Sequence, residues 1–185
     1  QNIGISDFYE QKTSFVNSFF IDMNLVFEKF FSRLVKEYYP LPSKEQFPEL
    51  AWKSTLGEKF TNKPDILIYN KDGSVAYIID TKYKTKVIQS DIRQIDDYMQ
   101  QKGKNEGYLV YPNTLDSKSD EWQTPQEHRN SIVKSRYIDV DKAIDLIYLK
   151  DSKTRKEEIL TMLKEILQWY YCLEIFSSNS ITFLF

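Results

Sequence analysis

The chain has 185 residues, of which 41% are hydrophobic and 15% aromatic, so it can bury a sizeable core in one domain and does not resemble a disordered protein. Its formal net charge of −2 excludes a protein that holds nucleic acid through overall positive charge, so such binding would need a local patch or a partner. No run of about 18 apolar residues is present, so we expect no membrane-spanning helix.

One histidine and one cysteine limit the available chemistry. A single histidine excludes zinc sites with several histidine ligands and His-metal nucleases within this chain. His128 itself lies in the polar stretch TPQEHRNS, where we expect a solvated loop residue. The single cysteine, Cys172, excludes an internal disulfide framework, and together with the lack of a signal peptide it predicts a cytoplasmic protein.

The N-terminal part of the chain predicts a helix and a connector. Apolar residues recur at helical spacing over residues 15–39, and Pro40 ends this predicted helix. Residues 40–48 contain three prolines and are expected to connect the helix to the next element of the fold. Residues 50–60 have weak strand character, with a turn at Gly57.

A β-hairpin is the next predicted element. Residues 65–69 and 75–83 have the composition of strands, and the NKDGS sequence between them is a strong turn signal. Ser90 as an N-cap predicts a helix that Gly103 ends. The sequence GYLVY at residues 107–111 predicts a short buried strand.

The C-terminal part predicts a loop, a strand and two helices. Residues 113–130 are polar and unpatterned, which favours a loop. A strand over residues 137–140 and a short helix over 141–149 come next, and a capping box at residues 154–157 opens a helix to about Leu173. The order α-β-β-β-α-β, with a further strand and helices after it, predicts an α/β domain around a mixed sheet.

Charged residues stand at the open end of the predicted hairpin. Strand alternation places Asp80 and Lys82 on one face, and closure of the hairpin around Lys71–Ser74 places Asp65 opposite Asp80. Two facing carboxylates repel each other, and a divalent cation such as Mg²⁺ would compensate them. Lys82 could then orient or deprotonate an attacking water, or neutralise charge on phosphorus.

An ordinary interpretation of the same charges stays open. In it, Asp65 simply begins a strand after Pro64, and the segment from Asp80 to Lys84 is a solvated strand end with a cross-strand ion pair. The preceding proline, the hairpin spacing and the apolar run that leads into Asp80 favour a reaction site instead.

At this point the sequence resembles a known superfamily. Pro64-Asp65 followed by Asp80-Thr81-Lys82 resembles the PD-(D/E)xK nuclease motif. More closely, KPDILIY, AYIIDTKYK, DIRQIDDY and GYLVYP resemble the nuclease domain of McrC, the endonuclease subunit of modification-dependent McrBC restriction systems, from about MNLVFEKF to GYLVYP. The resemblance implies a restriction-endonuclease-like core, with a mixed central sheet flanked by helices and extra helices at the C-terminus.

The resemblance also implies roles for individual residues. Asp65 and Asp80 would bind Mg²⁺, for which Mn²⁺ can substitute, and the backbone carbonyl of Thr81 would be a further ligand. Lys82 would be the catalytic lysine. Such folds often place a glutamate of the preceding helix near the metal, and Glu28 is the candidate; its alternative is an exposed glutamate on a tilted helix.

A second pair of residues supports the same resemblance. Gln94 and Tyr98 form a QxxxY pair on one helical face, similar to the element that supports the active site of RecB-like nucleases, although such a pair can also simply pack a helix onto a sheet. Lys84 and Lys86 are candidates for contacts with DNA phosphates, but most such lysines form a solvated face.

We therefore predict a metal-dependent DNA endonuclease domain that hydrolyses phosphodiester bonds. The alternatives are a RecB-like DNA-repair nuclease, and a degenerate nuclease fold that serves as a DNA-binding or assembly module. The resemblance implies a prokaryotic protein whose partner is McrB, a GTP-hydrolysing AAA+ ring that recognises modified DNA. Dimerisation is one way to cut both strands.

One nuclease domain is expected over residues 1–185, with its core at about 15–150 and a C-terminal helix at about 154–173. The chain begins with Gln1 rather than Met, so we expect a piece of a longer protein from which the ring-contacting part is absent. We expect little or no cleavage by such an isolated domain.

Overall fold

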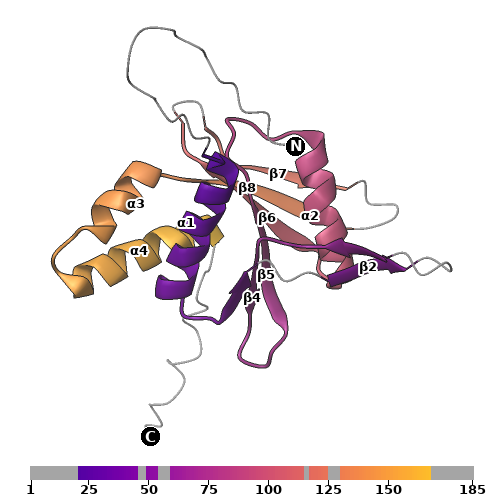
Figure 1. Cartoon of the computed structure of the whole chain (residues 1–185), viewed down its shortest axis with the longest axis horizontal. Coiled ribbons are helices and arrows are strands. Elements are labelled where there is room, and N and C mark those ends of the chain that lie inside the picture. Colours follow the sequence, from indigo (N-terminus) through magenta and orange to yellow (C-terminus); the bar gives the residue numbers. More distant parts are fainter. Residues whose placement is uncertain (1–20, 46–48, 54–58, 115–116, 125–129, 168–185) are drawn as a thin grey trace, which may run out of the picture.

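The computed structural model describes residues 21–45, 49–53, 59–114, 117–124 and 130–167 (Figure 1). Among the helices of these segments, none is both long enough and apolar enough to cross a membrane.

A six-stranded sheet forms the centre of the fold, with the strand order β1-β4-β5-β6-β8-β7. Its strands are β1 (Ser43–Glu45), β4 (Ile66–Tyr69), β5 (Val75–Thr81), β6 (Glu106–Pro112), β7 (Asp120–Gln123) and β8 (Ile132–Ile138). Strands β5, β6 and β8 run parallel to one another, whereas β1, β4 and β7 pair antiparallel with their neighbours. The sheet is therefore mixed, which confirms the predicted fold class.

Helices cover both faces of this sheet (Figure 1). The helices α1 (Met23–Tyr38), α3 (Val140–Ile147) and α4 (Ser152–Leu167) pack on one face, and α2 (Gln89–Gln101) packs on the other. Each face has its own cluster of buried apolar side chains, so the core consists of two layers that share the sheet.

The two layers explain the apolar runs of the central strands. Ile66, Ile68 and Ile79 belong to the cluster under α1 and α4. Leu67 and Ile78 belong to the cluster under α2. Because successive side chains of a strand point to opposite faces, a strand that is covered on both sides has to be apolar along its whole length.

The β4–β5 hairpin has the predicted register at its open end, whereas a register shift between Ile68 and Tyr69 changes the pairing next to the turn, where Tyr69 pairs with Val75. Ile66 pairs with Ile79, and the pairing continues without a shift as far as Ile68. Asp65 and Asp80 therefore lie directly beyond the Ile66–Ile79 pair, at the open end of the hairpin, as the sequence predicts.

A separate two-stranded sheet is inserted between β1 and β4. Its strands β2 (Glu49–Lys53) and β3 (Lys59–Asn62) pair antiparallel and account for the weak strand character of this region. The turn predicted at Gly57 lies outside the described residues. Without this insertion, the order α1-β1-β4-β5-α2-β6 matches the predicted α-β-β-β-α-β, but its first strand is β1 and not the predicted strand over residues 50–60. Strand β1, which lies in the proline-containing segment, was predicted only as a connector.

The predicted helix over residues 15–39 is wrong at its start. Ile21 and Asp22 are not helical, and α1 begins directly after Asp22, whose carboxylate accepts the Asn24 N–H at 3.0 Å. A capping side chain sets the first turn, and apolar spacing does not reveal it. Residues 15–20 lie outside the described part of the chain.

Two other helix starts also differ from the prediction, for the same reason. Ile88 rather than Ser90 is the N-cap of α2, and the Asp91 carboxylate accepts the Ile88 N–H at 3.3 Å. Helix α4 begins directly after Asp151, whose carboxylate accepts the Thr154 N–H at 3.1 Å. The predicted capping box therefore lies inside the helix, and an aspartate before it performs the capping.

The predicted loop over residues 113–130 is wrong in part, because it contains β7. Strand β8 begins at Ile132, well before the predicted start at Tyr137. Neither strand has a clear apolar pattern, because β7 (DEWQ) is a short edge strand and β8 (IVKSRYI) carries polar residues in its middle. His128 and the predicted end of the last helix at Leu173 lie outside the described residues.

We expect Gly107→Ala to destabilise the packing of α2 on the sheet. A Cβ at this position of β6 would meet Met99 Sδ at 2.6 Å and Ile95 Cγ1 at 2.8 Å. Overpacking a filled core typically costs about 1–3 kcal/mol. Urea denaturation should show this loss, with Gln101→Ala on the exposed side of α2 as the control; equal midpoints for the two variants would contradict the close packing.

Candidate active site

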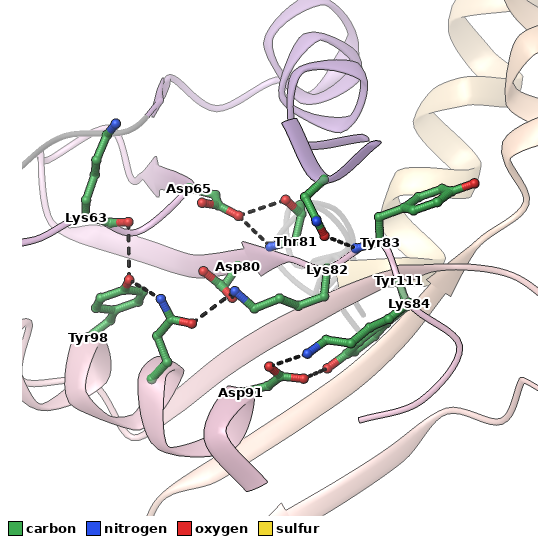
Figure 2. A network of polar contacts seen from close by, with 12 residues as sticks. Lys63, Asp65, Asp80, Thr81, Lys82, Tyr83, Lys84, Asp91, Tyr98 and Tyr111 are labelled. Carbon is green, nitrogen blue, oxygen red and sulfur yellow. Dashed lines mark hydrogen bonds and ion pairs between the residues drawn. The ribbon is translucent and has the colours of Figure 1, made fainter. Parts of the chain in front are cut away.

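The candidate site lies at the C-terminal end of β5, where the strand leaves its apolar surroundings (Figure 2). The Asp80 side chain is 1% exposed, and its Oδ2 atom lies 2.6 Å from Lys82 Nζ. The Lys82 N–H donates to the Val110 carbonyl at 2.9 Å, which continues the β5–β6 ladder past the end of the strand. This backbone geometry places Asp80 and Lys82 on the same side, as strand alternation predicts.

A chain of hydrogen bonds from α2 holds the Lys82 ammonium. Lys82 Nζ donates to Gln94 Oε1 at 3.0 Å, and Gln94 Nε2 donates to Tyr98 Oη at 2.9 Å. The Tyr98 hydroxyl in turn donates to the Lys63 carbonyl at 3.3 Å. Gln94 thus accepts from Lys82 and donates to Tyr98, so the orientation of its amide is fixed from both sides. The predicted QxxxY pair thus contacts the predicted catalytic lysine.

Asp65 is bound to the strand that carries Asp80. It is partly buried, and its Oδ2 atom accepts both the Thr81 N–H and the Thr81 hydroxyl at 2.7 Å (Figure 2). The structure therefore brings Asp65 to the end of β5, as the hairpin register predicts. It also gives Thr81 a contact that sequence reasoning missed, through its N–H and its hydroxyl. The role of the Thr81 carbonyl as a metal ligand stays a prediction.

The positive charge of Lys82 does not fully compensate the negative charges of Asp65 and Asp80. Burial of Asp80, reinforced by the negative charge of Asp65, raises the pKa of Asp80 to about 7 although Lys82 opposes the change. Burial lowers the pKa of Lys82, but the charges of Asp80, Asp65 and Asp91 outweigh burial and raise it overall. A further positive charge next to Asp80 would lower its pKa again and stabilise the ionised pair.

The residues at this site fit a hard divalent cation. Besides the ion pair with Lys82, the buried Asp80 Oδ2 atom has no hydrogen-bond partner. In the described part of the chain, no group of three or more His, Cys, Asp or Glu side chains is arranged to hold a metal ion. Mg²⁺ typically takes only one or two protein carboxylates and keeps several waters, so the Asp65 and Asp80 carboxylates suit it better than a zinc ion.

Glu28 does not join Asp65 and Asp80 in a three-carboxylate group. Its side chain on α1 is 13% exposed, and its Oε1 atom lies 3.7 Å from Lys29 Nζ. Glu28 is thus largely buried, as one of its two interpretations expects, but a role as a metal ligand stays a prediction.

The two lysines proposed for DNA contacts differ in their surroundings. Lys84 is partly buried, and its Nζ atom lies 2.8 Å from Oδ1 of the buried Asp91, whereas Lys86 is exposed. Asp91 also accepts the Tyr111 hydroxyl at 3.0 Å, and sequence reasoning singled out neither residue. The spacing of Asp91 three residues before Gln94, on the same helical face, is the signal that could have found it.

The raised pKa of Asp80 predicts how stability depends on pH without metal. A carboxyl group whose pKa is higher in the folded state stabilises the fold below its unfolded pKa, and this contribution is lost as the pH rises through about 7. We therefore expect Asp80→Asn in EDTA at about pH 8 to have a free energy of unfolding that exceeds that of the wild type by at most ~4 kcal/mol. The variant should accordingly unfold at a higher temperature.

The gain should shrink as the pH falls below about 7, and little of it should remain near pH 4, where Asp80 is protonated in the folded state. Asp97→Asn, which removes an exposed carboxylate from α2, is the matched control. If Asp80→Asn instead unfolds at a lower temperature at about pH 8, the Lys82 ion pair balances the charge of Asp80 without further help.

Comparison with known proteins identifies the family of the chain. A search of curated protein sequences finds no match. The model of the family described as McrBC 5-methylcytosine restriction system component matches residues 5–112, more than half of the chain, up to the end of β6. The match includes every candidate residue discussed above. The chain therefore belongs to the family of McrBC 5-methylcytosine restriction system components.

Proposed function

We propose that this member of the McrBC family is a DNA-cleaving hydrolase domain, an Mg²⁺-dependent endonuclease that cuts phosphodiester bonds. The observation that supports it best is the buried Asp80–Lys82 ion pair, in which Lys82 also contacts Gln94. A solvated strand end would leave both charges in water and would need no such support. We also propose a single domain from α1 to α4, because both core layers share one sheet.

Asp65 and Asp80 would hold the cation. When bound, Mg²⁺ would supply Lewis acidity that polarises a phosphoryl oxygen of the substrate. The Thr81 N–H and hydroxyl hold one oxygen of the Asp65 carboxylate, so this side chain is oriented before any ligand arrives. Fixed ligands of this kind reduce the reorganisation that catalysis would otherwise require.

Lys82 would act as a cation in the reaction. Because nearby carboxylates raise its pKa, it keeps its proton near neutral pH, which favours neutralising charge on the phosphoryl group over deprotonating a water. Gln94 accepts from the ammonium and so orients it, and Tyr98 orients Gln94. Burial raises the pKa of Tyr98, so its hydroxyl remains a donor.

A RecB-like repair nuclease would share the contact between Gln94 and Tyr98. The match to the McrBC family favours the restriction system instead. In such a system we propose that the partner is an McrB-like AAA+ GTPase subunit that brings the nuclease to DNA containing 5-methylcytosine.

Removal of Asp80 and removal of the Lys82 charge should have different effects. We expect Asp80→Ala to abolish cleavage and to weaken the thermal stabilisation of the chain by Mn²⁺, because the ligand is gone. Lys82→Met should lower cleavage by roughly 10²–10⁴-fold and should keep the stabilisation by Mn²⁺. Plasmid cleavage by the partner-activated protein and thermal unfolding of the chain measure the two properties, with Lys71→Met in the exposed hairpin turn as the control. Normal cleavage by Asp80→Ala would refute the proposed centre.

The chain without a partner should cleave weakly or not at all. Its net charge of −2 provides little attraction for DNA. In a protein that joins this chain to a ring-contacting part, adding the GTPase subunit, GTP and 5-methylcytosine DNA should restore cleavage, as measured on methylated and unmethylated plasmids. Robust site-specific cutting by the chain alone, without nucleotide, would argue against the proposal that a GTPase subunit has to bring the nuclease to DNA.

A further inference from the structure

Asp91 lies in a polar cluster that the proposed reaction does not explain. Its side chain on the first turn of α2 is 5% exposed, which is costly for a carboxylate unless donors surround it. Three donors do so. They are Lys84 Nζ at 2.8 Å and the Tyr111 hydroxyl at 3.0 Å (Figure 2), and the Ile88 N–H at 3.3 Å. We call Lys84, Asp91 and Tyr111 the Asp91 cluster.

The Asp91 cluster and the candidate active site are held by the same two elements, α2 and β6. Asp91, Gln94 and Tyr98 recur at i, i+3 and i+7 and therefore lie on one face of α2. Tyr111 comes directly after Val110 in β6, and the Val110 carbonyl accepts the Lys82 N–H at 2.9 Å. The same short stretch of β6 thus fixes the backbone of Lys82 and, through Asp91, the helical face that presents Gln94.

The cluster also spans the connection between β5 and α2. Residues 82–88 form neither helix nor strand, so side-chain contacts have to fix their path. The Tyr83 N–H donates to Asn24 Oδ1 at 3.2 Å and ties the start of this connection to α1. Asp91 binds Lys84 in its middle and Ile88 at its end.

We propose that Asp91 is a positioning residue for Lys82. It fixes the first turn of α2 against β6 and the 82–88 connection, so that Gln94 meets the Lys82 ammonium in one geometry. This inference rests on the proposed nuclease function. It assigns Lys84 to Asp91 rather than to DNA, and leaves Lys86 as the exposed candidate for phosphate contacts.

A positioning role has a different signature from a purely structural one. Displacement of a reacting group by about 1 Å can lower a rate by roughly 10²-fold, even when the fold is intact. The metal ligands Asp65 and Asp80 are held by the hairpin and Thr81, and not by Asp91. Loss of Asp91 should therefore lower turnover while metal affinity stays nearly unchanged.

The test compares Asp91→Asn with Asp97→Asn, an exposed carboxylate on the same helix. Asparagine keeps an acceptor for Tyr111 but loses the ion pair with Lys84. With the full chain, the GTPase subunit, GTP and methylated plasmid, we expect Asp91→Asn to lower kcat by about 10–100-fold. KM and the Mn²⁺ affinity should change less than about 3-fold, and hydrogen exchange of residues 82–88 should rise only in Asp91→Asn.

A second variant covers the case in which Asp91→Asn does not fold. Tyr111→Phe removes one donor and keeps the ring, so it should lower kcat by a smaller factor, about 3–10-fold, with the same unchanged Mn²⁺ affinity. Adding Lys84→Met to Asp91→Asn should cost little more than Asp91→Asn alone, because the two residues act through one contact.

Several outcomes would overturn the inference. One is that Asp91→Asn or Tyr111→Phe cleaves as fast per folded molecule as Asp97→Asn. Another is a loss of Mn²⁺ affinity that parallels the loss of kcat, which would place Asp91 in the metal site. A wild-type complex that does not cleave at all would refute the proposed function and this inference together, whereas an active wild type with an equally active Asp91→Asn would refute the inference alone.

Discussion

The burial of the Asp80 carboxylate at the end of β5 is the constraint on which the rest of the candidate site depends. A charge with 1% exposure requires compensation, and the ion pair with Lys82 supplies only part of it, since the pKa of Asp80 stays raised. Lys82 in turn needs an acceptor besides Asp80, which Gln94 provides. The polar contact that α2 makes with Lys82 thus follows from the burial of Asp80.

The two-layer architecture decides which helix can provide that shell. Asp80 shares its strand parity with Ile78, which packs under α2, whereas Ile79 packs under α1 and α4. A side chain of α2 therefore reaches Lys82 directly. Helix α1, which carries Glu28, packs on the opposite face of the sheet.

The sequence predicts the parts of this arrangement that depend on local rules. The turn signal predicts the hairpin, and helical spacing predicts the contact between Gln94 and Tyr98, but the register shift between Ile68 and Tyr69 has no signal in the turn. The short edge strands β1 and β7 bury too few residues to give an apolar pattern. The Asp91 cluster joins Tyr111 to a residue twenty positions earlier, and no spacing rule connects a strand to a helix over that distance.

Two lysine side chains near the site point toward buried carboxylates, and this bears on how the proposed nuclease would be controlled. Lys82 and Lys84, which lie just beyond the end of β5, are both paired with buried carboxylates. The site therefore offers little free positive charge to a DNA backbone, and the chain as a whole is slightly acidic. A centre built in this way would stabilise a phosphoryl group that has already been delivered, but it would attract DNA poorly. Such a separation of cleavage from DNA capture suits a restriction system, because the proposed nuclease would then act only where another component has recognised modified DNA.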